Sequence, residues 1–90
     1  MTSGFTIPVT QKPKQMVYHV LVNNVYSFTY TVNFTNETAY RIGVYAGSSS
    51  MWNETKNYSD VITSCTDSLI TLNTAEYSGY GGRVVVMIWY

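Results

Sequence analysis

Residues 16–34 carry the clearest strand pattern of the chain, and apolar and polar residues alternate most regularly in its second half, residues 25–34. In the first half of this stretch, one face carries Met16, Tyr18, Val20 and Val22, and the other carries Val17, His19 and Leu21. In the second half, one face carries Tyr26, Phe28, Tyr30, Val32 and Phe34, and the other carries Val25, Ser27, Thr29, Thr31 and Asn33. A period of two is typical of β-strands. Asn23-Asn24 lies between the halves and favours a hairpin, because Asn tolerates positive φ.

Shorter β-rich segments flank this hairpin. We expect strands at residues 5–9, where Pro8 indicates a sheet edge, and at 39–46, where Tyr40, Ile42 and Val44 point together. Further strands are expected at 58–64, around Val61 and Ile62, and at 69–72. Residues 47–57 are predicted to form a long loop that includes Trp52, and the glycine- and tyrosine-rich residues 73–82 a turn.

The last segment, residues 83–90, is almost uninterruptedly apolar. An exposed strand of this composition is an aggregation hazard, so we expect it to be covered on both faces or paired on both edges. The sequence therefore predicts a central position for it in a sheet.

These segments predict one all-β domain spanning residues 1–90. No window has a helical apolar stripe, and about seven short strands fit an antiparallel immunoglobulin-like or fibronectin-like β-sandwich; a small barrel is the alternative. Cys65 is the single cysteine, so an internal disulfide cannot form, and stability must come from packing or from oligomerisation. Residues 1–15 are a candidate flexible or dimerising arm.

The charge balance narrows the range of partners. Five basic and five acidic residues give a formal net charge of zero. Nucleic-acid binding normally requires a basic patch, so we do not expect a nucleic-acid partner. Residues 1–15 contain no apolar run, so we expect no signal peptide, and no apolar run in the sequence is long enough to span a bilayer. Near-zero charge favours self-association, so a homodimer or higher oligomer is expected. The localisation is unknown from the sequence, which is compatible with action outside cells or within a virion.

The sequence contains few residues that could carry out catalysis. His19 is the single histidine, and nothing near Cys65 in the sequence indicates an activated thiol. No candidate ligands have zinc-site spacing, and the glycine-rich segment precedes a strand rather than the helix that a phosphate-binding loop requires. We therefore expect a protein that is not an enzyme and holds neither metal nor cofactor.

Three segments are similar to successive segments of the fungal immunomodulatory proteins. They are Thr31-Val32-Asn33-Phe34, Thr38-Ala39-Tyr40-Arg41-Ile42-Gly43-Val44 and Glu76-Tyr77-Ser78-Gly79-Tyr80-Gly81. The resemblance covers about half the chain and implies a lectin-like protein with a fibronectin-type sandwich that dimerises and agglutinates cells. The family's apolar N-terminal dimerisation helix has no counterpart before Thr31, and this chain contains Cys, His and Met that the family typically lacks.

Two functions remain open at this point. The first is a module that binds a glycan or a cell-surface glycoprotein through exposed aromatic rings and neighbouring amides; its candidate residues are Trp52, Asn53, Tyr77 and Tyr80. Trp52 could instead fold back over the core and close one end of the sandwich. The second is a structural subunit of a larger assembly, such as a virion decoration or tail protein, which gains stability from its neighbours. Asn33, Asn36, Asn53 and Asn57 lie in glycosylation sequons.

Overall fold

The computed structural model describes residues 5–22, 26–45, 50–73 and 84–90. These residues form eight short strands and one four-residue helix. In chain order the elements are β1 (Phe5–Pro8), β2 (Gln15–Val22), β3 (Tyr26–Asn33), β4 (Thr38–Tyr45), β5 (Met51–Lys56), α1 (Tyr58–Val61), β6 (Ile62–Cys65), β7 (Leu69–Leu72) and β8 (Val84–Trp89). No helix among these residues is long and apolar enough to cross a membrane.

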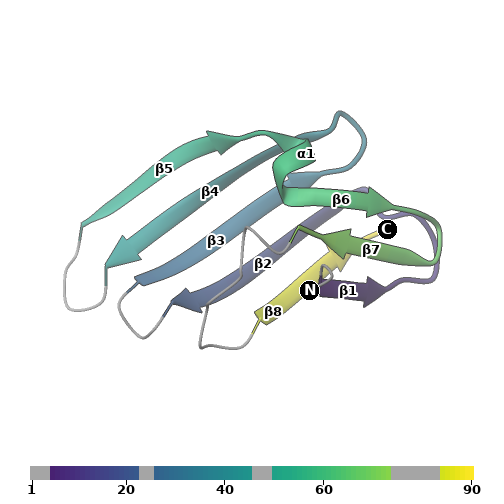
Figure 1. Cartoon of the computed structure of the whole chain (residues 1–90), viewed down its shortest axis with the longest axis horizontal. Helices are drawn as coiled ribbons and strands as arrows, with labels where there is room; N and C mark the ends of the chain where they lie inside the picture. Colours follow the sequence, from purple (N-terminus) through teal and green to yellow (C-terminus); the bar gives the residue numbers. More distant parts are fainter. Residues whose placement is uncertain (1–4, 23–25, 46–49, 74–83) are drawn as a thin grey trace.

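The larger sheet has five antiparallel strands in the order β5-β4-β3-β2-β8. Strands β2 to β5 follow one another both along the chain and across the sheet, and β8 pairs with the outer side of β2 (Figure 1). A tight turn joins β3 to β4. In it, the Asn33 side chain accepts hydrogen bonds from the backbone N–H groups of Thr35 (3.0 Å) and Asn36 (3.2 Å), and Glu37 takes a φ of 56°. An Asn side chain that bonds the backbone two and three residues later is a common way to stabilise such a turn.

The smaller sheet has three strands in the order β1-β7-β6. It lies over one end of the larger sheet, where β2 begins and β3 ends (Figure 1). At the β6–β7 turn, the Thr66 hydroxyl oxygen accepts hydrogen bonds from the backbone N–H groups of Ser68 (3.2 Å) and Leu69 (3.0 Å). The two sheets therefore form a sandwich that is thick at one end of the larger sheet.

The core lies between the two sheets. The larger sheet buries alternate side chains of its central strands on its inner face, namely Met16, Tyr18, Val20, Phe28, Tyr30, Val32, Phe34 and Ala39. The smaller sheet and α1 bury Val61, Ile62, Ile70 and Leu72 against them. Tyr18 and Tyr30 stack with ring centroids 4.5 Å apart and planes 4° from parallel. The predicted alternation is confirmed where side chains are described, at residues 16–20 and 27–34: the face with Met16, Tyr18 and Val20 and the face with Phe28, Tyr30, Val32 and Phe34 are the buried ones.

The predicted fold is confirmed as an all-β, sandwich-like arrangement of antiparallel strands, with eight strands instead of about seven. The immunoglobulin-like order of strands is not confirmed. In an immunoglobulin domain the second and third strands belong to different sheets, whereas β2 to β5 here are consecutive strands of one sheet.

The predicted central position of the C-terminal strand is wrong. Strand β8 lies at the edge of the larger sheet and, among the described residues, pairs only with β2. Its apolar residues lie in two different environments. Val86 and Ile88 pack against the core, whereas Met87 and Trp89 are exposed on the other face. A continuous apolar run therefore does not require burial on both sides.

Two further predictions need correction. The expected long loop contains strand β5, and the segment expected as a strand from residue 58 begins with α1 before β6. Strand β5 lacked an apolar alternation because its inward positions are Trp52, Glu54 and Lys56, of which two are charged. The predicted hairpin at Asn23-Asn24 and the predicted turn at 73–82 lie outside the described residues, except for Asn73.

Candidate functional site

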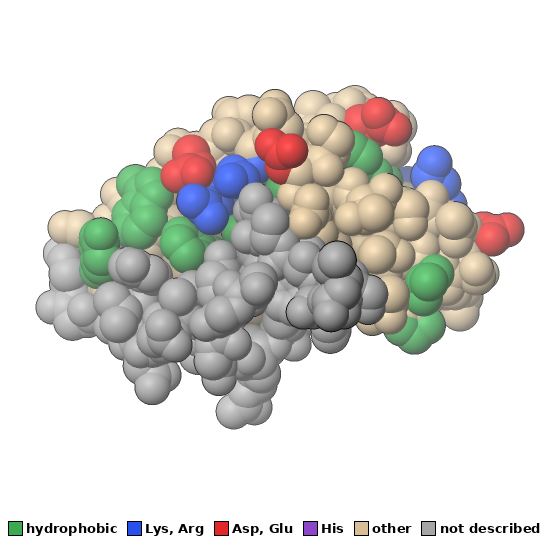
Figure 2. All heavy atoms as spheres, in the orientation of Figure 1, with side chains coloured by type: hydrophobic (Ala, Val, Ile, Leu, Met, Phe, Trp, Pro, Cys, Tyr) green, Lys and Arg blue, Asp and Glu red, His purple; other side chains and the backbone are tan. Residues whose placement is uncertain are grey.

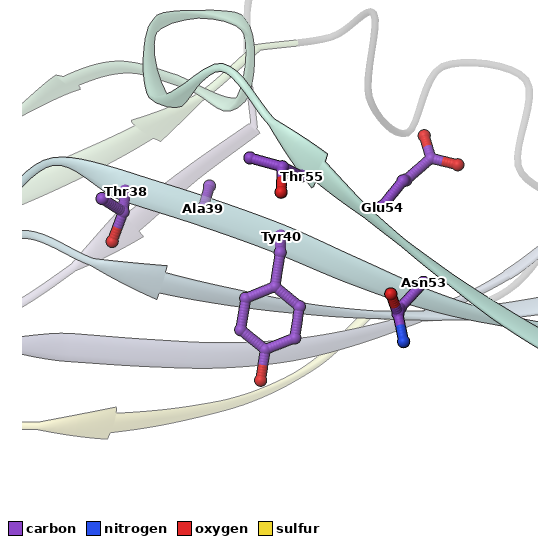
Figure 3. A pocket seen from close by; sticks show the side chains of 6 residues that line it. All are labelled: Thr38, Ala39, Tyr40, Asn53, Glu54 and Thr55. Atoms are coloured by element: carbon purple, nitrogen blue, oxygen red, sulfur yellow. The ribbon is translucent and has the colours of Figure 1, made fainter.

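A shallow hollow of about 380 Å³ lies on the outer face of the larger sheet, over β4 and β5. It is lined by Thr38, Ala39, Tyr40, Asn53, Glu54 and Thr55. In the β4–β5 register Tyr40 lies opposite Thr55, and Asn53 lies opposite Ile42, so these side chains share the outer face. Figure 3 shows Tyr40 and Asn53 extending to the same side of the sheet, with Glu54 pointing away from them.

Tyr40 is the aromatic surface of this hollow, with 45% of the residue exposed. The Asn53 amide and the Thr55 hydroxyl make no hydrogen bond to another described residue, and the Thr38 hydroxyl donates to the Asn36 side-chain oxygen (2.8 Å). An amide both donates and accepts, and a hydroxyl can do the same. The outer side of the hollow therefore combines an exposed ring with neutral hydrogen-bonding groups.

Trp52 lies on the other face of the same strand. Its ring covers Gly43 of β4 so closely that a Cβ added at Gly43 would lie 2.7 Å from Trp52 Cε2. It also makes an edge-to-face contact with Phe28 (5.9 Å between ring centroids) and a tilted contact with Tyr45 (5.3 Å). Trp52 is partly buried and packs against the core.

Arg41 is held beside this aromatic group by an ion pair. Its Nη2 lies 2.9 Å from Glu54 Oε1, its Nη1 donates to the Tyr30 hydroxyl (3.0 Å), and Trp52 Nε1 donates to Glu54 Oε2 (3.2 Å). The Arg41 guanidinium also lies 4.4 Å from the Phe28 ring centroid. Burial alone would lower the pKa of Arg41, but the Tyr30 hydrogen bond and the Glu54 charge raise it overall. The ion pair lets β4 and β5 place charged residues on the inner face at this end of the sheet.

Two of the four residues predicted as a ligand site are described, and they do not share a face of the sheet. Trp52 and Asn53 are neighbours in β5, so their side chains point to opposite sides of the sheet. Tyr77 and Tyr80 lie outside the described residues. Sequence reasoning missed Tyr40, Thr38 and Thr55 as lining residues. The available signal was that Tyr40 and Ile42 share a face of their strand; without β5 as a neighbouring strand, that face had no polar partners.

The described residues bring no catalytic or metal-binding groups together. His19 lies on the outer face of β2, where its Nδ1 is 3.1 Å from Thr29 Oγ1, whereas Cys65 ends β6 in the other sheet. Burial raises the pKa of the Cys65 thiol, and the positive charge of Lys12 offsets part of this increase. No group of three potential metal ligands occurs in the part of the chain that is described. On the face shown in Figure 2, acidic and basic side chains are interspersed and form no patch of one sign.

Comparisons with known proteins yield no relative. No family model matches the chain, and no curated protein and no solved structure is significantly similar to it. The resemblance to the fungal immunomodulatory proteins therefore stays a prediction.

Proposed function

We propose that this protein is a non-catalytic, lectin-like module that binds a short glycan in the hollow over β4 and β5. The observation that carries the proposal is the exposed Tyr40 ring beside the uncommitted polar groups of Asn53 and Thr55. The site differs from the one expected from the sequence, since it retains Asn53 and replaces Trp52 with Tyr40.

The chemistry of the hollow suits a sugar. The C–H face of a pyranose packs on an aromatic ring, and its hydroxyl groups need neutral donors and acceptors at the rim of that ring. A volume of about 380 Å³ lies at the lower end of the range for small-molecule sites, about 300–1,000 Å³. This size favours one or two sugar units.

The resemblance noted in the sequence extends this proposal. A lectin-like protein of that kind would act on cell-surface glycoproteins and modulate immune cells. The Tyr40 strand belongs to one of the segments that carry the resemblance, which links the proposed site to the proposed class.

A glycan array probed with purified, tag-free protein tests the proposal. Tyr40→Ala removes the stacking ring, and Tyr45→Ala is a matched control because Tyr45 is 46% exposed on the same strand but belongs to the opposite face. We expect specific hits whose affinity falls about tenfold or more in Tyr40→Ala, equivalent to about 1.4 kcal/mol, and stays unchanged in Tyr45→Ala.

Two results would contradict the proposal in different ways. A blank array with folded protein would exclude the lectin-like function. Hits that persist in Tyr40→Ala would keep the function but move the site elsewhere. Asn53→Asp is a useful third variant, because it preserves shape while replacing the amide donor with a negative charge.

The second candidate function, a subunit of a larger assembly such as a virion, is favoured by a different observation. Strand β8 presents an apolar, unguarded edge, with Met87 and Trp89 exposed beside it. An assembly subunit would form large oligomers and give a blank glycan array, so the two functions are separable by size measurement and by the array.

A further inference from the structure

Strand β8 forms one edge of the larger sheet, and among the described residues no strand pairs with its other side. The Trp89 carbonyl accepts a hydrogen bond from the Lys14 N–H (2.8 Å), so it faces β2. Backbone groups of alternate residues in an antiparallel strand point to the same side. The N–H and C=O groups of Val84, Val86 and Ile88 therefore face away from β2, where no described strand of this sheet follows (Figure 1).

The other three sheet edges carry features that discourage pairing with another chain. Strand β5 has Glu54 and Lys56, β1 has four residues and ends at Pro8, and β6 has four residues with a register irregularity between Ile62 and Ser64. Charges, proline, irregularities and short length are the usual protections of edge strands. Strand β8 reads Val-Val-Val-Met-Ile-Trp and has none of them.

We infer that the free edge of β8 pairs with β8 of a second copy of this chain, so that two five-stranded sheets join into one antiparallel sheet of ten strands. An unguarded apolar edge is a template for strand addition. A second copy is the occupant best matched to it, because β8 carries no charge that would face its own copy across the pair. The neutral net charge of the chain adds no repulsion between the copies.

The pleat of the strand restricts how the two copies align. A two-fold axis that relates antiparallel neighbours runs perpendicular to the sheet, so the inner faces of both copies lie on the same side. Only residues of the same face can then lie opposite one another. The longest overlaps place the axis at Val86 or at Met87. In both alignments, the N–H and C=O groups of Val86 that point away from β2 pair with backbone groups of the second copy.

The outer face supplies further contact area. Met87 is 56% exposed, and Trp89 next to it on that face is also exposed. With the axis at Met87, the two Met87 side chains lie opposite one another and each Trp89 lies opposite residue 85 of the second copy; with the axis at Val86, each Met87 lies opposite residue 85 of the second copy. The inference does not depend on glycan binding.

Substitution of an exposed methionine on each outer strand tests the inference. Met87→Lys adds a charge to the β8 edge, and Met51→Lys is the matched control because Met51 is 65% exposed at the start of β5, on the opposite edge of the same sheet. By sedimentation velocity, we expect the wild-type protein and Met51→Lys to have twice the mass of the 10.2 kDa chain. We expect Met87→Lys to be a folded monomer by circular dichroism.

Amide hydrogen exchange locates the interface directly. The N–H groups of Val86 and Ile88 should be protected in the wild-type protein and exchange rapidly in Met87→Lys, while the N–H of Met87, which faces β2, stays protected in both. A monomeric wild-type protein, equal dissociation by both substitutions, or an open-ended series of larger oligomers would each overturn the β8 dimer.

Discussion

Both faces of the larger sheet carry tyrosine side chains, but the tyrosine on the inner face is buried and the one on the outer face is exposed. Tyr30 and Tyr40 belong to the adjacent strands β3 and β4, yet Tyr30 is fully buried and Tyr40 is 45% exposed. Tyr30 stacks on Tyr18 and accepts a hydrogen bond from Arg41, whereas Tyr40 borders a hollow with Asn53 and Thr55. The position of a residue in the strand alternation, not its chemical type, decides whether it contributes to stability or is available for recognition.

In β4 and β5 the inner positions include charged side chains, whereas the outer positions beside the hollow carry neutral ones. Arg41 and Glu54 lie on the inner side, paired with each other and surrounded by aromatic rings. Such a pair needs its hydrogen bonds satisfied once it leaves water. The outer positions of the same strands, including Thr38, Asn53 and Thr55, remain accessible and neutral, which is why the candidate site belongs there.

The largest expected effect tests this difference with a pair of identical substitutions. Tyr30→Ala should lower the free energy of unfolding by about 3–5 kcal/mol, because it removes a fully packed ring and leaves a cavity. Tyr40→Ala should lower it by less than about 1 kcal/mol, since its ring already contacts water. Urea unfolding followed by circular dichroism measures both. Equal losses in the two variants would remove the distinction between the faces.

A smaller effect is expected from the close approach of Gly43 and Trp52. Gly43→Ala places a methyl group against the indole ring, and such overpacking should cost about 1–3 kcal/mol. Combining Gly43→Ala with Trp52→Leu should give a smaller loss than the sum of the single losses, because the smaller side chain leaves room for the methyl group. Additive losses in urea unfolding would show that the indole does not contact Gly43.

The smallest expected effect concerns ionisation on the inner side. Tyr58 of α1 makes an edge-to-face contact with Phe34 (6.2 Å between centroids), and burial, aided by the nearby Cys65 and Glu37, raises the pKa of Tyr58 to about 12. The unfolded value is about 10. The folded state binds this proton more tightly, so this contribution is fully present below pH 10 and is lost as the pH rises towards 12.

Thermal unfolding at several pH values between about 9 and 11, on either side of the unfolded pKa of about 10, measures this loss of stability. The comparison is between Cys65→Ser and the double variant Cys65→Ser/Tyr58→Phe, so that the thiol does not titrate in either protein. The double variant should lose less stability over this range. Identical profiles would show that the Tyr58 hydroxyl ionises as freely in the folded protein as in the unfolded chain.

The sequence alone was sufficient to predict part of this architecture. The strand pattern around Tyr18 and Tyr30 predicted both central strands, and around Tyr30 apolar and polar positions differ at nearly every step. Strand β5 escaped prediction because Glu54 and Lys56 occupy inward positions, and an ion pair to Arg41 leaves no trace in the pattern of one strand. The edge position of β8 was missed because strand order depends on pairings between distant segments.

The candidate site was hidden for the same reason. Tyr40 and Asn53 are 13 positions apart, and only the β4–β5 register makes them neighbours. The prediction of Trp52 with Asn53 assumed a loop, in which consecutive side chains can face one ligand. A strand places consecutive side chains on opposite faces, so the prediction paired Asn53 with Trp52 and not with Tyr40, the aromatic residue that shares its face.

The position of the hollow at the far edge of the sheet from β8 has a geometric consequence. In the β8-paired dimer, the two hollows lie on the same broad surface, eight strand spacings apart, or about 38 Å at about 4.8 Å per spacing. Two receptors of that arrangement suit a crowded, repetitive carbohydrate surface better than a single free sugar. For a glycan-binding dimer of the kind proposed above, bivalent attachment would strengthen binding by about 10²–10⁴-fold without any new contact, so weak individual sites would be sufficient for firm adhesion.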